Sequence, residues 1–405
     1  MKNKISSLYL ISIFKNVLKN AVVASFVDFL SSLNKDTSFD DLLKKYSDFI
    51  YVLYNSEFNQ DFYSCLKHLI YTDENILSKG CTDCIRDNES ILNTARYELS
   101  LFDELLKIDY EKIKSSLLEK YEDKSEIINH LPVFYSCSKC SFDLDEILKS
   151  YLEKGFGEFS CYSAFKFTED KKIIPIKNFN SLTFNDLKNY EYQQNIIKQN
   201  TKAFLEGKEA NNILLYGDRG CGKSSSVKAL IDEFADYNLK IIQVYKESFI
   251  YLSELYEKLS VLPLKFIIFA DDISFDEDDK NFSSIKAILE GSLSDKPSNT
   301  LIYATTNRMH LVKESFSSRA GNEVHCNDTI DEIVSLSDRF GIMLTFSFLT
   351  KSEYLDIVKQ IANDCGIEVN DKLYFDAEKF AALKAIRTPR VARQFITDYI
   401  AGIEL

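Results

Sequence analysis

The sequence contains no tryptophan, and it has only 5 prolines and 12 glycines among 405 residues. So few helix breakers exclude a collagen-like or loop-rich repeat protein and indicate a helix-rich chain. The chain also has no excess of basic charge, because it contains 49 Lys and Arg residues but 62 Asp and Glu residues, which gives a net charge of −13. This balance argues against a protein that coats nucleic acid with its whole surface, although it leaves room for a local basic patch.

The chain also lacks a run of about 18 uncharged apolar residues, so we expect no membrane-spanning helix. Its basic start, Lys2 and Lys4, precedes an apolar run as in a signal peptide. However, Lys15 and Lys19 interrupt the apolar pattern and no small-residue cleavage site follows. The apolar residues recur at helical spacing, which favours a packed helix over a membrane-surface helix. With nine cysteines and no secretion signal, we expect reduced thiols and a cytoplasmic protein.

The chain has three regions with different hydrophobic patterns. The length predicts about two or three domains, which agrees with this number. Residues 1–175 form almost continuous amphipathic helical patterns and carry no chemical motif. Residues 176–349 alternate short apolar runs with helical ones, which predicts an α/β fold with a parallel sheet between two layers of helices. Residues 350–405 are helical again, and we expect a small helical lid.

The motif that decides the interpretation lies at residues 217–224, Gly-Asp-Arg-Gly-Cys-Gly-Lys-Ser, which match G-x-x-x-x-G-K-[ST] in full. Glycines let backbone N–H groups turn toward phosphates, and the start of the next helix adds a favourable dipole. A helix-capping glycine turn would explain the glycines but not the Gly-Lys-Ser ending. Lys223 is expected to reach the β- and γ-phosphates, and Ser224 to bind Mg²⁺. The predicted nucleotide-binding residues are Gly217, Asp218, Arg219, Gly220, Cys221, Gly222, Lys223, Ser224 and Ser225.

A second motif is the apolar run at residues 266–270, which ends in Asp271 and Asp272. A buried strand that delivers carboxylates at its end is how P-loop enzymes hold Mg²⁺ and orient the attacking water. Asp271 is expected to contact the metal through water, and Asp272 to accept a proton from the attacking water or to polarise it. A simple strand-end turn is the alternative, and the upstream glycine loop disfavours it.

Together with these motifs, four further segments resemble those of AAA+ ATPases. Residues 300–307 resemble the sensor-1 strand, and residues 335–341, Ser-Leu-Ser-Asp-Arg-Phe-Gly, resemble the segment that carries the arginine finger. Residues 388–393, Thr-Pro-Arg-Val-Ala-Arg, resemble the sensor-2 start of the lid helix, as in branch-migration helicase motors. Residues 184–190 are similar to the entry segment that packs on adenine.

The resemblance implies a role for one residue in each of these segments. Asn307 would position the water, and Tyr190 would contact the nucleotide. Arg339 would act in trans on the γ-phosphate of a neighbouring subunit, and Arg390 would act in cis. Arg308 and Arg319 are rival finger candidates, and both proposed arginines could instead form surface salt bridges, the ordinary role of an exposed arginine.

A closer match is to a bacterial AAA+ subgroup, the domain of unknown function 815, over about residues 180–400. The segments that resemble this subgroup are residues 216–225, 304–311 and 335–341. The sequence departs from the usual AAA+ pattern at two positions. Asp272 stands where most members have Glu, and its shorter side chain predicts slow turnover. Asn189 stands where Gly is common, which affects the expected local turn.

Cysteine chemistry offers weaker signals. Two C-x-x-C pairs could supply four thiolates to zinc, but they lie far apart in a helical region and lack a glycine-rich knuckle. We therefore favour ordinary thiols over zinc, and no βαβ pattern supports a thioredoxin-like role. Cys221 is expected to be merely small; redox gating is the alternative, because a helix start lowers the pKa of a thiol. The paired cysteines are Cys81, Cys84, Cys137 and Cys140.

These observations predict a P-loop αβα core of AAA+ type that binds and slowly hydrolyses Mg-ATP. A finger in trans implies a ring or helical homo-oligomer, and the work would be done on an unidentified protein client. Two alternatives stay open. The first is a nucleotide-dependent scaffold with little hydrolysis, which the Asp272 departure favours. The second is a DNA-remodelling motor, which the negative charge disfavours.

Overall fold

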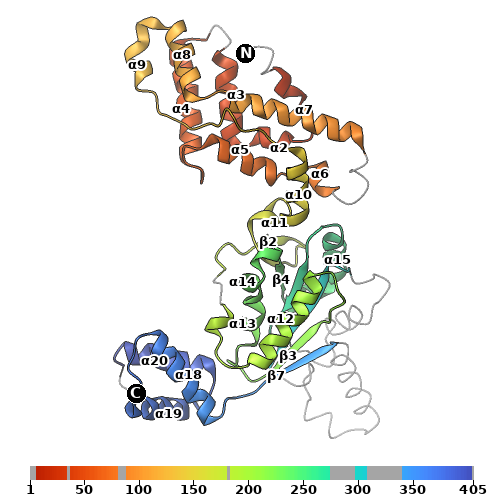
Figure 1. The fold of residues 1–405 in the computed structure, drawn as a ribbon, viewed down its shortest axis with the longest axis vertical. Helices are drawn as coiled ribbons and strands as arrows, with labels where there is room; N and C mark the ends of the chain where they lie inside the picture. Colours follow the sequence, from red (N-terminus) through yellow and green to blue (C-terminus); the bar gives the residue numbers. More distant parts are fainter. Residues whose placement is uncertain are drawn as a thin grey trace. The chain divides into compact units, whose positions relative to one another are not determined.

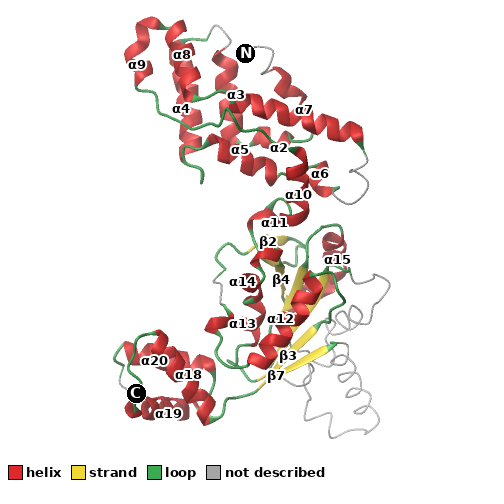
Figure 2. Ribbon diagram, viewed as in Figure 1, coloured by secondary structure: helices red, strands yellow, loops and turns green. Residues whose placement is uncertain are grey.

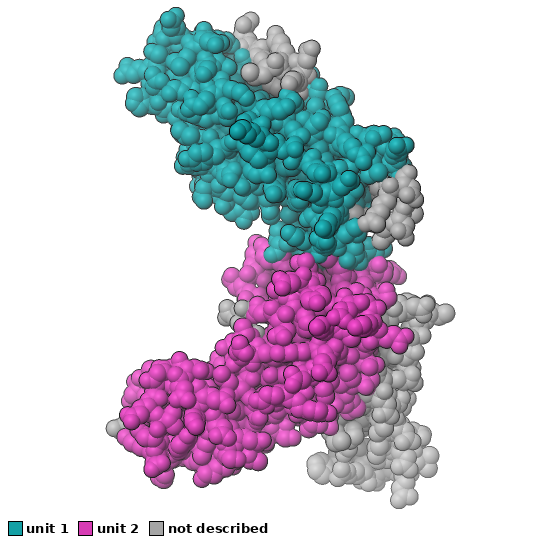
Figure 3. Space-filling model, viewed as in Figure 1, with its two compact units in different colours: residues 1–161, 261–263 teal, residues 162–260, 264–405 magenta. Residues whose placement is uncertain are grey.

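The computed structural model describes residues 6–33, 37–80, 88–179, 183–273, 297–307 and 340–403. The chain forms two compact units (Figure 3). Unit 1 comprises Met1–Cys161 and Val261–Pro263, and unit 2 comprises Tyr162–Ser260 and Leu264–Leu405. Within the described ranges, no helix is both long enough and apolar enough to cross a membrane.

Unit 1 is built from helices, as the periodicity predicted (Figure 2). Aromatic rings fill its centre, and the Phe26 ring centroid lies 4.7 Å from that of Phe49 and 4.6 Å from that of Phe62. Short polar side chains fix several helix starts by accepting a backbone N–H, as Ser38 does from Asp41. The helices are α2 (Lys15–Lys19), α3 (Ala21–Leu33), α4 (Phe39–Tyr54), α5 (Phe62–Tyr71), α6 (Ile76–Lys79), α7 (Glu89–Leu106), α8 (Tyr110–Lys120), α9 (Ser125–Asn129), α10 (Leu144–Lys154) and α11 (Glu158–Cys161).

Unit 2 contains a seven-stranded sheet in the order β2-β1-β4-β5-β6-β3-β7 (Figure 1). All pairings are parallel except that of β1 with β2. The strands are β1 (Ala164–Phe167), β2 (Ile173–Pro175), β3 (Ile213–Gly217), β4 (Lys240–Val244), β5 (Phe266–Ala270), β6 (Thr300–Thr306) and β7 (Ile342–Phe346).

The first two strands lie at or before residue 175, where the sequence predicted the domain boundary. Phe165 and Phe167 of β1 are buried, and β1 pairs with β4 in parallel. Unit 1 accordingly ends at Cys161, earlier than residue 175. Charge and a proline at residues 171–175 suggested a domain boundary, but the segment belongs to an edge hairpin, where proline is tolerated.

Both faces of the sheet are covered, which gives the predicted three-layer αβα arrangement. On one face, Ile213, Ile267 and Leu301 pack with Ile197 and Val227 of the helices. Residues that alternate with them, such as Leu214, Ile268 and Ile302, are buried on the opposite face. The helices of the core are α12 (Glu191–Leu205), α13 (Lys223–Lys228), α14 (Leu230–Glu233) and α15 (Leu252–Ser260).

The last three helices, α18 (Lys351–Asp364), α19 (Asp371–Lys384) and α20 (Pro389–Ile400), pack around a hydrophobic core of their own. Tyr354, Phe380 and Phe395 are among its buried members. Each helix begins with a side-chain cap, from Thr350, Asn370 and Thr388 respectively. This is the small helical lid that the sequence predicted, and it follows β7 directly.

One cysteine pair of unit 1 departs from the expected reduced thiols, whereas Cys65 and Cys161 are free as expected. Cys137 and Cys140 form a disulfide across a turn in which Cys140 N donates to Cys137 O. Their sulfur atoms are therefore bonded to each other, and this pair offers no thiolates to a metal. Cys81 and Cys84 lie outside the described residues, so the four-cysteine zinc hypothesis has no described site.

A buried carboxylate organises the start of unit 1. Glu98 of α7 is completely buried, and it accepts hydrogen bonds from the backbone N–H groups of Ser12, Ile13 and Phe14 at 2.8–3.1 Å. The Ser12 hydroxyl donates a further bond of 2.8 Å. These N–H groups precede α2 and have no partner within that helix, so the carboxylate acts as its cap from a distant helix.

We expect Glu98→Ala to destabilise unit 1 by about 3 kcal/mol, because it leaves buried N–H donors without partners. The midpoint of thermal unfolding, followed by circular dichroism, should fall by about 6–12 °C. Glu89→Ala on the exposed start of the same helix is the matched control and should change stability by less than about 0.5 kcal/mol. Equal midpoints for the two variants would contradict the capping role of Glu98.

Candidate functional site

A pocket of about 590 Å³ lies at the carboxyl ends of β3, β5 and β6 and extends to the lid. Its volume is within the range of small-molecule sites. Because these strands are parallel, the loops that follow them meet at one edge of the sheet. Among the predicted site residues, those that line the pocket are Tyr190, Arg219, Gly220, Cys221, Gly222, Lys223, Ser224, Ser225, Asp271, Asp272, Asn307 and Arg390.

The glycines of the loop after β3 are required by its backbone. Gly217 has φ 129°, and a Cβ there would lie 2.1 Å from the carbonyl oxygen of Phe346 on β7. Gly222 has φ 92° directly before α13. Only glycine adopts these values without strain. The loop therefore lies against β7 and turns abruptly into the helix.

Lys223 is the first residue of α13, and its ammonium lies under the loop. Its Nζ donates to the carbonyl oxygens of Gly217 and Asp218 at 2.7 Å and to Asn307 Oδ1 at 3.1 Å. Burial lowers the pKa of Lys223, because the charged form loses hydration. The chain thus holds a cation in a partly desolvated position, where an anion would stabilise it.

Ser224 and Asp271, the predicted magnesium residues, are in direct contact. The Ser224 hydroxyl donates to Asp271 Oδ1 at 2.5 Å, and the Thr305 hydroxyl donates to the same oxygen at 2.7 Å. The sequence alone did not identify Thr305, although it lies in the strand predicted at residues 300–307, two residues before Asn307. The hydroxyl and carboxylate oxygens are the hard ligands that Mg²⁺ prefers, so the residues present fit this ion.

Asp272 and Asn307 form a second polar pair. Asn307 Nδ2 donates to Asp272 Oδ1, and the backbone N–H of Asp272 donates to the Thr305 hydroxyl at 2.8 Å. Asp272 has φ 51°, a left-handed conformation that aspartate tolerates better than most residues. The Thr305 hydroxyl therefore contacts both aspartates: it donates to the Asp271 carboxylate and accepts from the Asp272 backbone N–H.

The segment before α12 turns through two left-handed residues, Asn189 with φ 69° and Tyr190 with φ 67°. Asparagine is enriched in this conformation, so Asn189 supports the turn where a glycine was expected. Gln194 Nε2 holds the turn from α12 by donating to the carbonyl oxygens of Leu187 and Asn189. The Tyr190 hydroxyl donates to Ser347 O at 2.5 Å, and burial raises its pKa.

Two residues of the glycine loop at positions 217–224 contact the segment that joins β7 to the lid. The Asp218 N–H donates to Phe346 O at 2.8 Å, and Asp218 Oδ2 accepts from the Phe348 N–H at 2.9 Å. Cys221 is buried with its Sγ 3.5 Å from Ser347 O. Burial raises the pKa of Cys221, whereas the redox-gating alternative depended on a lowered thiol pKa.

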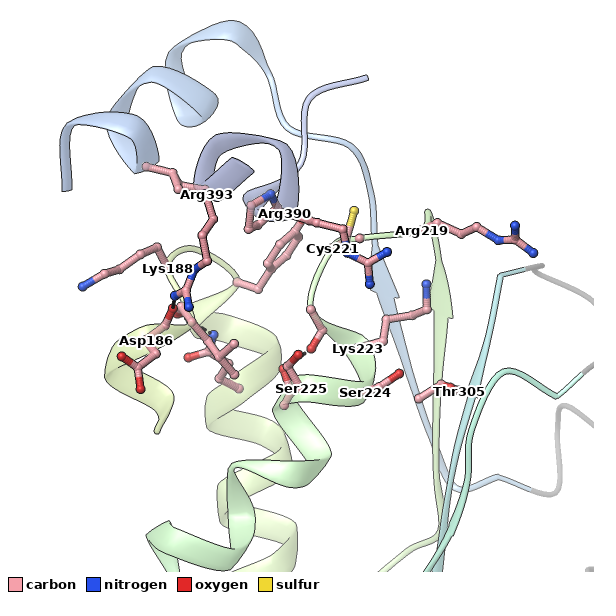
Figure 4. Close-up of a pocket in the computed structure, with 18 of the residues that line it drawn as sticks. Asp186, Lys188, Arg219, Cys221, Lys223, Ser224, Ser225, Thr305, Arg390 and Arg393 are labelled. Atoms are coloured by element: carbon pink, nitrogen blue, oxygen red, sulfur yellow. Dashed lines mark hydrogen bonds between the residues drawn. The ribbon is translucent and has the colours of Figure 1, made fainter. Parts of the chain in front are cut away.

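The lid contributes arginines to the pocket (Figure 4). Arg390 follows Thr388, the N-cap of α20, and makes no hydrogen bond or ion pair with any described residue. Arg393, which sequence reasoning did not single out, donates to the carbonyl oxygen of Asp186 at 3.2 Å. Lys188, also missed, pairs with Asp364 of α18 at 3.2 Å. The predicted finger Arg339 and its rivals, Arg308 and Arg319, lie outside the described residues.

Cys221 should react slowly with alkylating reagents, because its thiol is buried and its raised pKa keeps it protonated. We expect brief iodoacetamide treatment at neutral pH, read by peptide mass spectrometry, to modify the exposed Cys161 and Cys365 at least about tenfold faster than Cys221. In denaturant the three rates should converge. Fast labelling of Cys221 in the folded protein would revive the redox-gating alternative.

Comparisons with solved structures give weak similarities. A RuvB variant from Thermotoga maritima is 18% identical with a TM-score of 0.34, covering 52% of this chain and 61% of that chain. Orc1 from Aeropyrum pernix, solved in complex with DNA, is 18% identical with a TM-score of 0.37, covering 53% and 61%. The FIGL-1 AAA domain, solved in complex with ADP, is 14% identical with a TM-score of 0.35, covering 50% and 68%.

A search of curated proteins finds no match. The family described as "Protein of unknown function (DUF815)" matches residues 160–403, which is more than half of the chain. The matched region begins just before β1 and includes the sheet, the pocket residues and the lid. The protein therefore belongs to the DUF815 family, as the sequence resemblance predicted, and the matched region contains its αβα core.

Proposed function

We propose that the protein binds Mg-ATP at residues 217–224 and hydrolyses it slowly to drive conformational work on a protein client. The observation that carries the proposal is the convergence of three groups on one pocket. These groups are the Lys223 ammonium, the Ser224–Asp271 pair and the Asp272–Asn307 pair. A cation, hard oxygen ligands and a water-orienting carboxylate are the parts that phosphoryl transfer needs.

Lys223 would exchange its carbonyl contacts for phosphate oxygens when nucleotide binds. Burial already disfavours its charged form, so an anionic partner gains more here than at the surface. Mg²⁺ would be held by the Ser224 hydroxyl and, through water, by Asp271, and it would neutralise charge between the β- and γ-phosphates. Thr305 would keep Asp271 oriented in both states.

Asp272 and Asn307 would orient the attacking water beside the γ-phosphate. Aspartate is one methylene shorter than glutamate, so its carboxylate reaches less far toward that water, and slow turnover follows. In the proposed mechanism Arg390 adds positive charge from the lid of the same chain. Arg339 would act from a neighbouring subunit, which requires a homo-oligomer in a ring or helix.

The conformational change would pass from the loop to the lid through the segment after β7. Asp218 of the phosphate loop binds both Phe346 and Phe348, and the lid begins at Lys351. A change in the loop on nucleotide binding or phosphate release would therefore move the start of the lid. A scaffold that binds nucleotide without turnover is the second candidate, because Asp272 is short and its carboxylate is already engaged by Asn307.

Replacing Lys223 by alanine should weaken Mg-ATP binding by about 10- to 100-fold, since the contact between a cation and phosphate is charge-assisted. Isothermal titration calorimetry measures the dissociation constant directly. Lys228→Ala is the matched control, because Lys228 ends the same helix and does not line the pocket. Wild-type protein that binds no nucleoside triphosphate would refute the proposed function.

Replacing Asp272 by asparagine should lower the rate of phosphate release by about 100-fold or more while ATP still binds, because the side chain can no longer accept a proton. Phosphate release from purified protein under saturating Mg-ATP is the measurement. Lys223→Ala provides the background rate. If the wild-type rate equals the rates of both variants, the scaffold candidate replaces the enzyme.

A further inference from the structure

We propose that Arg219, the third residue of the phosphate loop, contacts the γ-phosphate of ATP in cis and distinguishes ATP from ADP. The inference rests on the proposed function and assigns one residue a task that the motif leaves open. The motif itself accepts any residue at this position. The argument rests on the neighbouring side chains of the loop and on the charges around it.

Among the side chains of the loop before Lys223, Arg219 is the one that is available to contact the phosphates. Between Gly217 and Lys223, the non-glycine residues are Asp218, Arg219 and Cys221. Asp218 accepts the Phe348 N–H, and Cys221 is buried against the carbonyl oxygen of Ser347. Arg219 is exposed, lines the pocket and has no hydrogen bond or ion pair with the described part of the chain.

The side chain leaves the loop on the side where hydrolysis would occur. Figure 4 shows Arg219 rooted above Lys223, with its side chain extended sideways from the loop and away from Arg390. The Asp271 and Asp272 carboxylates follow β5, which is adjacent to β6 and Thr305. A flexible arginine at this position of the loop can rotate so that its guanidinium contacts a γ-phosphate that Lys223 binds. Arg390 would approach from the opposite side.

Charge balance favours this contact only when a γ-phosphate is present. The loop already carries the Lys223 ammonium, so the exposed Arg219 guanidinium adds a second positive charge beside it. A triphosphate tail supplies further negative charge on the γ-phosphate oxygens, and ADP ends at the β-phosphate. The planar guanidinium donates two parallel N–H bonds to phosphate oxygens, which an ammonium cannot do.

The same contact would accelerate hydrolysis. The water oxygen forms a bond to the γ-phosphorus while the bond from that phosphorus to the β–γ bridging oxygen breaks. The bridging electron pair stays on ADP, and the water proton passes to the Asp272 carboxylate and then to the departing phosphate. Negative charge on the γ-phosphate oxygens is stabilised by the Arg219 guanidinium, as arginine fingers do in trans. This would partly offset the short reach of Asp272.

The experiment compares Arg219→Ala and Arg219→Lys with Arg96→Ala, an exposed arginine of unit 1, as the control. Dissociation constants for Mg-ATP and Mg-ADP are measured by calorimetry in the Asp272→Asn background, so that ATP stays intact. We expect Arg219→Ala to weaken ATP binding by about tenfold and ADP binding by less than about twofold. Arg219→Lys should recover only part of the difference, and Arg96→Ala should bind as the parent does.

Turnover is then measured for the same substitutions without Asp272→Asn. Arg219→Ala should lower the rate by about 10- to 1000-fold at saturating ATP. If Arg219→Ala leaves both the preference for ATP over ADP and the rate unchanged, the inference is wrong and the proposed function stands. If the parent protein binds neither nucleotide, both fail together.

Discussion

The contact between Gly217 and Phe346 constrains the whole site. Strands β3 and β7 pair in parallel register with Gly217 opposite Phe346, and a side chain at Gly217 would collide with the Phe346 carbonyl. This close approach lets the Asp218 N–H reach the same carbonyl, which fixes where the phosphate loop begins. The segment that leads to the lid starts at that point. One backbone contact thus links the loop that would hold phosphate to the element that would move.

The register of the next strands arranges the acidic groups. Ala270 of β5 pairs with Ala304 of β6, so Asp271 and Asp272 follow beside Thr305. The Thr305 hydroxyl can then donate to Asp271 and accept from the Asp272 backbone N–H. Ser224 reaches the same Asp271 oxygen from α13. The groups that we propose for metal binding and water orientation therefore share one threonine, at the ends of parallel strands rather than on a free loop.

Several interpretations failed where a local pattern competed with tertiary packing. Residues 171–175 have the charge and proline of a linker, but the burial of Phe165 and Phe167 draws the segment into the sheet. Cys137 and Cys140 were expected as separate thiols, yet their turn brings them into a disulfide. In each case the neighbour that decides the outcome is invisible to composition and spacing.

The sequence by itself determined the fold class, the position of the glycine loop at residues 217–224, the paired aspartates and the family. These are carried by residue types at fixed local spacing and by the alternation of strand and helix patterns. Only the tertiary structure decided which side chains meet. It joined Thr305 to Asp271, Arg393 to the Asp186 carbonyl and Asp218 to the lid segment. Those contacts join residues that are distant in the chain. They are selected by strand register and by the space that a missing Cβ leaves, not by local propensity.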